Sequence, residues 1–150
     1  MTHALAIELD AIGDTRPLWD AWLASAETVL EVDSATLPAD RSDAADALDA
    51  AGVGNWRVLL ERFAQDHAPA YLRRDATTSA ALQALASGEV TLGVFTDAPA
   101  ELARTALTQL GATRRISMLE TGAGALERLL AAIGSDAAVV RTQADLLNRP

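Results

Sequence analysis

Two carboxylates near the amino terminus have a spacing suited to phosphoryl transfer. Glu8 and Asp10 stand two residues apart at the end of a short apolar run, Ala4 to Leu9. Alternate side chains of an extended strand point the same way, so both carboxylates face one side. Phosphoryl transfer through a covalent intermediate uses one carboxylate as nucleophile and a second as the acid that protonates the leaving oxygen. Mg²⁺ and a positively charged side chain neutralise the phosphate. We therefore take this pair as a candidate catalytic site.

A threonine ends a second apolar run, Val90 to Phe95, and a helix is predicted from Pro99 to Leu110. A hydroxyl beside the unpaired amides of a helix N-terminus can bind a phosphate oxygen. Thr96 and Asp97 are therefore candidate phosphate-binding residues. Capping of the helix's own amides by either side chain is the alternative, and it stays open.

The elements that must position these residues indicate an α/β fold. The first predicted strand, Ala4 to Leu9, is followed by a turn over 10–14 and then by helices alone. These helices are predicted from Pro17 to about Glu31, Arg41 to Ala51, Asn55 to about His67, where Pro69 ends the helix, and Ser79 to Ala86. Strands and helices then alternate. The predicted strands are Val90 to Phe95, Arg115 to Leu119 and Ala137 to Val140, and each is followed by a predicted helix: Pro99 to Leu110, Leu126 to Ile133 and Gln143 to Asn148. Such alternation predicts a three-layer, Rossmann-like parallel sheet with its site at the carboxyl ends of the strands.

This plan resembles the haloacid dehalogenase (HAD) superfamily of phosphohydrolases that carry a helical cap. The stretch from Glu8 to Trp19 is similar to the family's Asp-x-Asp-Gly-Thr motif, and Gly93-Val-Phe-Thr96-Asp-Ala-Pro99 is similar to its second motif. The resemblance implies strand order 3-2-1-4, a core formed by 1–15 and 87–150, and a cap of residues 16–86 inserted after the first strand.

Two alignments of the first motif are open. Counted from the strand, Glu8 takes the place of the nucleophile and Asp10 that of the acid, with one methylene more than the family's aspartate. Counted from Gly13, Asp10 becomes the nucleophile and Ile12 stands at the position of the acid. This alignment resembles the dehalogenase branch of the superfamily, in which the second aspartate is also absent. We favour the first alignment because it retains a pair of carboxylates.

The family's metal and cation positions are changed in this chain. Arg141 and Thr142 stand where the family has the Gly-Asp of its metal motif, and only Asp145 is acidic, so the implied metal ligands Glu8, Asp10 and Asp145 form a weak Mg²⁺ site. The chain has no lysine, because all twelve basic residues are arginine. Arg141 could instead bind phosphate through its bidentate guanidinium; a solvated surface arginine is the alternative.

Composition narrows the class of partner. The net charge of −9 repels phosphate backbones and anionic membranes, so neither nucleic acid nor a membrane is an expected partner. No apolar run is long enough to span a bilayer and no signal peptide is evident, which predicts a cytoplasmic protein. Arginine in place of lysine, with abundant alanine, is typical of a bacterial genome rich in G and C.

Three functional hypotheses follow. The first is a HAD-like protein with impaired catalysis that acts as a small-anion-binding or regulatory module. The second is an active, atypical HAD phosphatase that uses Mg²⁺ to hydrolyse a small phosphorylated metabolite. The third is a structural subunit, in which an apolar cap surface binds a partner or forms a homodimer.

Overall fold

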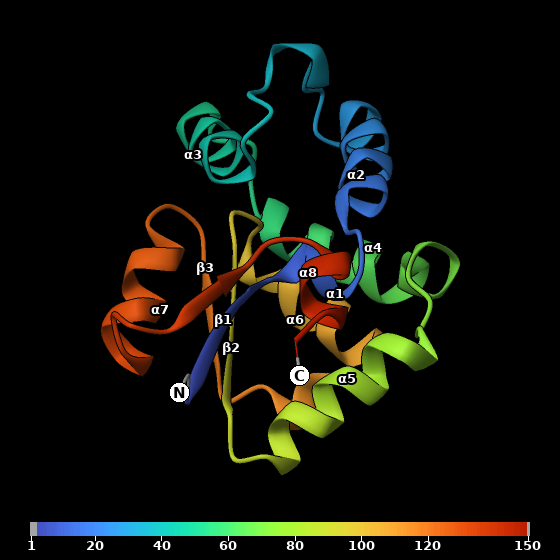
Figure 1. The fold of residues 1–150 in the computed structure, drawn as a ribbon. Helices are drawn as coiled ribbons and strands as arrows, with labels where there is room; N and C mark the ends of the chain where they lie inside the picture. The colour runs from blue at the N-terminus through green and yellow to red at the C-terminus, as the bar shows by residue number, and fades with distance from the viewer. Residues whose placement is uncertain (1–2, 150) are drawn as a thin grey trace.

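The computed structural model describes residues 3–149, and Figure 1 shows its fold. Residues 1, 2 and 150, at the outer ends of the predicted core segments, lie outside the described residues. The elements are β1 (Ala4–Glu8), α1 (Leu9–Ile12), α2 (Arg16–Val29), η1 (Ser34–Thr36), α3 (Arg41–Ala51), α4 (Trp56–Tyr71), α5 (Ala76–Ser87), β2 (Thr91–Thr96), α6 (Ala100–Gln109), η2 (Thr113–Arg115), β3 (Met118–Thr121), α7 (Ala125–Ile133), β4 (Ala138–Val140) and α8 (Gln143–Leu147).

The four strands form one parallel sheet in the order β3-β2-β1-β4, so the predicted α/β class and the predicted strand order are confirmed. β1 is central and pairs with β2 on one side and with β4 on the other. All four carboxyl ends therefore lie at one edge of the sheet, where the first site residues were expected.

The two faces of the sheet bury different side chains. Leu5, Ile7, Leu92 and Val94 point into the larger core, which is completed by side chains from α1 to α6 and from α8. Ala6 and Phe95 point the other way, into a smaller cluster with Ala125 and Leu129 of α7. α7 packs closely on that face (Figure 1): a Cβ added to Gly93 would come within 2.6 Å of a Leu129 methyl carbon.

Helices α2 to α5 lie between β1 and β2 along the chain, as predicted. Three buried tryptophans hold α2 against α4, with ring centroids 5.2 Å apart for Trp19 and Trp22 and 5.7 Å apart for Trp22 and Trp56. α4 also packs along α6, and α5 contacts β2 and α8. The division into a core of 1–15 and 87–150 and a cap of 16–86 stays a prediction.

Three predicted boundaries are wrong. α5 begins at Ala76 rather than at Ser79, because the Asp75 side chain caps the helix by accepting from the Thr78 amide. α4 does not end before Pro69 but continues to Tyr71, because the exposed proline lies in the last turn, where it removes only one hydrogen bond. β3 begins at Met118 rather than at Arg115, because Thr113–Arg115 form a 3₁₀ turn. Among the described residues, no helix is both long and apolar enough to cross a membrane.

Candidate functional site

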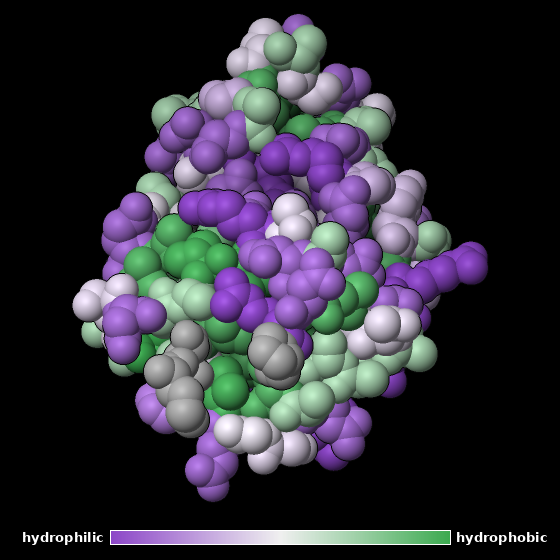
Figure 2. Space-filling model, viewed as in Figure 1, coloured by the Kyte–Doolittle hydropathy of each residue, from purple (hydrophilic) through white to green (hydrophobic). Residues whose placement is uncertain are grey.

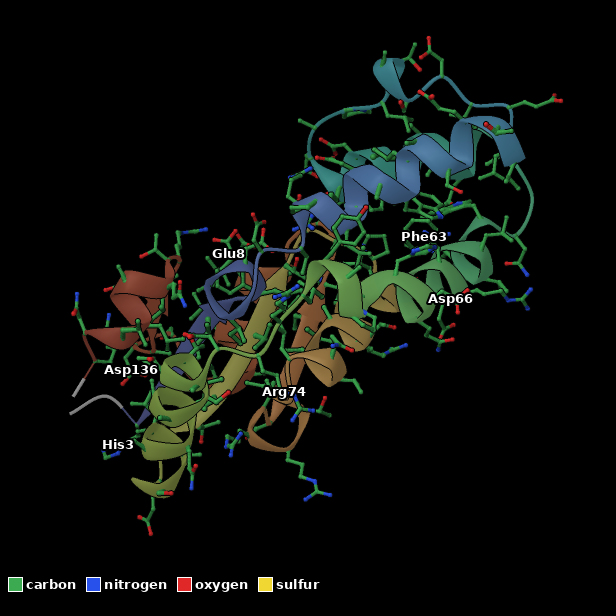
Figure 3. The ribbon with its side chains drawn as sticks, turned by 90° about the vertical axis from the view of Figure 1, so that its right-hand side faces the viewer. His3, Glu8, Phe63, Asp66, Arg74 and Asp136 are labelled. Atoms are coloured by element: carbon green, nitrogen blue, oxygen red, sulfur yellow. The ribbon has the colours of Figure 1, made fainter. Side chains whose placement is uncertain are left out.

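Five of the six predicted site residues, all but Asp145, meet at the carboxyl edge of the sheet. Glu8 ends β1, Thr96 ends β2, and Arg141 directly follows β4. With Asp10 and Asp97 they line one cavity of about 330 Å³, which we call the cleft. Figure 3 labels Glu8 at this edge, and Figure 2 shows hydrophilic side chains gathered between the sheet and the overlying helices. Neighbouring parallel strands thus bring together five residues from three segments that lie far apart in the sequence.

Arg41 occupies the centre of this group. It is the first residue of α3, and its side chain is only 2% exposed. Nε donates to Asp97 at 2.9 Å, Nη1 donates to the Thr15 hydroxyl at 2.6 Å, and Nη2 lies 3.4 Å from an Asp10 carboxylate oxygen and 3.5 Å from the Thr96 hydroxyl. A buried guanidinium therefore neutralises the carboxylates on both sides of it.

Asp97 caps a helix, but not the one that follows it. Its carboxylate accepts a hydrogen bond from the Arg41 backbone N–H at 2.9 Å, so it satisfies the first amide of α3. No side chain caps α6, the helix that follows Asp97. The Thr96 hydroxyl accepts from the Ala98 amide at 3.2 Å. Thr96 is thus used in a local turn and Asp97 in the attachment of α3, and neither side chain caps α6 as the alternative supposed.

Asp10 is held by its own neighbourhood as well as by Arg41. One carboxylate oxygen accepts from the Thr15 amide at 3.1 Å and from the Thr15 hydroxyl at 2.6 Å. The other oxygen faces the Arg41 guanidinium. The helical turn α1, which the sequence predicted only as a turn, places Asp10 two residues beyond the strand end and aims it at Thr15. Both oxygens of Asp10 therefore have partners within the protein.

Glu8 and Arg141 form a second, more open pair. Their side chains lie 3.5 Å apart and are 33% and 59% exposed, respectively. The Arg141 guanidinium also lies 5.4 Å from the centre of the Phe95 ring. Burial raises the pKa of Glu8, Arg141 lowers it to a lesser degree, and the nearby Asp10 raises it further. The net pKa of Glu8 is above its ordinary value.

A glycine loop completes the wall of the cleft. Gly122 and Gly124 line it and have left-handed backbone angles, with φ of 80° and 70°. Arg128 fixes this loop by donating to the backbone carbonyls of Thr121 and Ala123 and by pairing with Glu120 at 3.1 Å. Arg128 is therefore committed to the loop.

The residues present do not fit the Mg²⁺ site that the family resemblance implied. Asp145 is exposed, is absent from the lining of the cleft, and lies 4.0 Å from Arg149. Within residues 3–149, no three His, Asp or Glu side chains are grouped so that they could hold a metal ion. The Arg41 guanidinium already lies against Asp10 and Asp97, where a cation would need those oxygens.

Arg41 is the residue that sequence reasoning missed. Its position on α3 lies far in the chain from the strand ends that supplied the other candidates. A signal was present in α3, because Arg41, Ala44, Ala45 and Leu48 follow the i, i+3, i+4, i+7 spacing of a buried helix face. An arginine on such a face must find buried partners.

Comparisons with known proteins do not assign the chain to a family. No protein-family model matches the chain, and a search of curated proteins finds no match. The function is therefore argued from the geometry of the cleft.

Proposed function

We propose that this chain is a HAD-like protein with impaired catalysis whose cleft binds a small anion. The observation that carries the proposal is the buried Arg41 guanidinium between Asp10 and Asp97. The parallel order 3-2-1-4 and the helices between β1 and β2 support a HAD-like descent, with α2 and α3 as the cap over the cleft.

Catalysis is impaired because the carboxylates are already engaged. A nucleophilic carboxylate must reach phosphorus, and its partner must deliver a proton to the leaving oxygen. Asp10 is bonded to Thr15 and faces Arg41, while Glu8 is paired with Arg141. A metal ion at this position would have to displace a guanidinium that is bonded to Asp97 and Thr15.

An anion can still be bound at the open side of the cleft. The cleft is also lined by Arg16, so Arg16 and Arg141 offer two guanidinium groups to a ligand. Arg141 is 59% exposed and its ion pair with Glu8 is long, so an anion that accepts a bidentate bond can compete for it. The volume of about 330 Å³ suits a small metabolite bearing one phosphate or carboxylate group.

The alternative, an active atypical phosphatase, has one specific observation in its favour. Glu8 ends β1 with Asp10 two residues on, and both carboxylates line the cleft, as a nucleophile and acid pair must. In that function Glu8 or Asp10 would be the nucleophile, Asp10 the acid and Thr96 a phosphate ligand.

Two measurements separate these functions. Turnover of a panel of phosphomonoesters, with and without Mg²⁺, compares the wild type with a Glu8→Ala, Asp10→Ala double variant. A Glu61→Ala, Asp66→Ala double variant, with both changes at exposed positions of α4, is the matched control. Background rates in all three proteins are expected. Metal-dependent turnover that is lost only in the first double variant would establish the phosphatase.

Calorimetric titration with inorganic phosphate then tests the binding function. Arg141→Gln is expected to weaken binding about tenfold, the loss of one charged hydrogen bond. Arg149→Gln removes an arginine outside the cleft and should leave the affinity unchanged. Equal affinity for phosphate in wild type and Arg141→Gln would refute the cleft as an anion site.

A further inference from the structure

A second group of arginines lies away from the cleft. Arg74, Arg114 and Arg115 line a cavity of about 610 Å³ together with Thr108, Gly111 and Thr113. The segment from Gly111 to Arg115 leads from α6 into the amino end of β3, whereas the cleft lies at the carboxyl ends of the strands. Figure 3 labels Arg74 well apart from Glu8. We call this cavity the arginine pocket.

Two of its arginines are positioned by backbone carbonyls. Arg74 Nε donates to the Gln109 carbonyl at 3.3 Å, and Arg115 Nη1 donates to the Gly111 carbonyl at 3.4 Å. The Arg74 guanidinium lies directly over Gly111, where an added Cβ would be 2.8 Å from Cζ. Each contact uses one N–H of the guanidinium, so several donors of each group stay available for a ligand.

The charges in the arginine pocket are not balanced by the protein. No carboxylate lines it, and none of its three arginines has an ion-pair partner among residues 3–149. The chain nevertheless has 21 acidic residues and a net charge of −9. Three like charges around one cavity repel one another, and an anion would remove that cost.

We propose that the arginine pocket binds a small phosphate-bearing molecule, with the phosphate held by the guanidinium groups of Arg74, Arg114 and Arg115. Planar guanidinium groups match phosphate oxygens in bidentate pairs. The Thr113 hydroxyl lines the same cavity and can donate to a further oxygen, whereas the Thr108 hydroxyl, 3.4 Å away, already donates to the Arg104 carbonyl at 3.0 Å. The pocket is distinct from the cleft, so the proposal does not depend on the proposed function.

The test uses inorganic pyrophosphate as the probe, titrated by calorimetry into wild type and variants at low ionic strength. Arg114→Gln is expected to weaken binding about tenfold, and an Arg114→Gln, Arg115→Gln double variant about a hundredfold. Arg73→Gln is the matched control, because Arg73 is exposed beside Arg74 but does not line the pocket. Circular dichroism and thermal unfolding verify that each variant is folded.

Binding that is weakened in the Arg114 and Arg115 variants, and kept in Arg73→Gln and Arg141→Gln, supports the arginine pocket. Loss of binding only in Arg141→Gln would place the anion in the cleft and overturn this inference. An equal loss in Arg73→Gln would show attraction to general positive charge, and absence of binding at 10 mM pyrophosphate would refute the site.

Discussion

Arg41→Met tests whether the buried guanidinium holds α3 against the sheet. Methionine keeps an apolar stem of similar length and removes the contacts to Asp97, Thr15 and Asp10. Removing one partner of a buried ion pair costs about 3–5 kcal/mol. Asp10 and Asp97 are 27% and 30% exposed, so water can replace part of the lost contacts. We therefore expect a loss of about 2–4 kcal/mol in the free energy of unfolding, or about 5–15 °C in Tm.

The assay is urea unfolding followed by circular dichroism and by fluorescence of the three tryptophans. Arg57→Met is the control, because Arg57 pairs with Asp49 at 2.6 Å but both side chains are more than 40% exposed, at 42% and 47%. Its loss should not exceed about 1 kcal/mol. A cost for Arg41→Met no greater than that for Arg57→Met would refute the reasoning.

Two further predictions concern Glu8 and the α7 face. Because the folded pKa of Glu8 is raised, its contribution to stability is fully present at low pH and declines as pH rises through the folded pKa. Glu8→Gln should therefore gain stability relative to wild type between about pH 4 and pH 7, measured by Tm at each pH, and no pH dependence of this difference would contradict the shift. Gly93→Ala should cost about 1–3 kcal/mol in urea unfolding, because the new methyl meets Leu129 at 2.6 Å. Gly88→Ala, whose nearest contacts lie at 3.5 Å, should stay within about 0.5 kcal/mol of wild type, and an equal cost for both would disprove the close packing of α7.

The sequence predicted the part of the cleft that stands at or just after the strand ends. Glu8, Thr96 and Arg141 each stand where an apolar run ends, and parallel strands bring such positions to one edge.

Arg41 could not be placed in this way, because its position depends on how α3 docks. Periodicity identifies the buried face of the helix but not the surface that receives it. Arg41 donates to Asp97, which lies 56 residues after it in the chain, and to Thr15, which lies 26 residues before it. The roles of Thr96 and Asp97 were undecided for the same reason, since Asp97 caps a helix that precedes it by many residues.

The central position of β1 has a consequence for synthesis on the ribosome. β1 is made before the other strands, yet its neighbours are β2, which follows five intervening α-helices, and β4, which is made after β2 and β3. Helices α2 to α5 can form from local contacts while β1 still has two unpaired edges. The apolar segment Ala4–Glu8 is therefore exposed to aggregation or to chaperones until β2 emerges, and its second edge is satisfied only when Ala138–Val140 have left the exit tunnel.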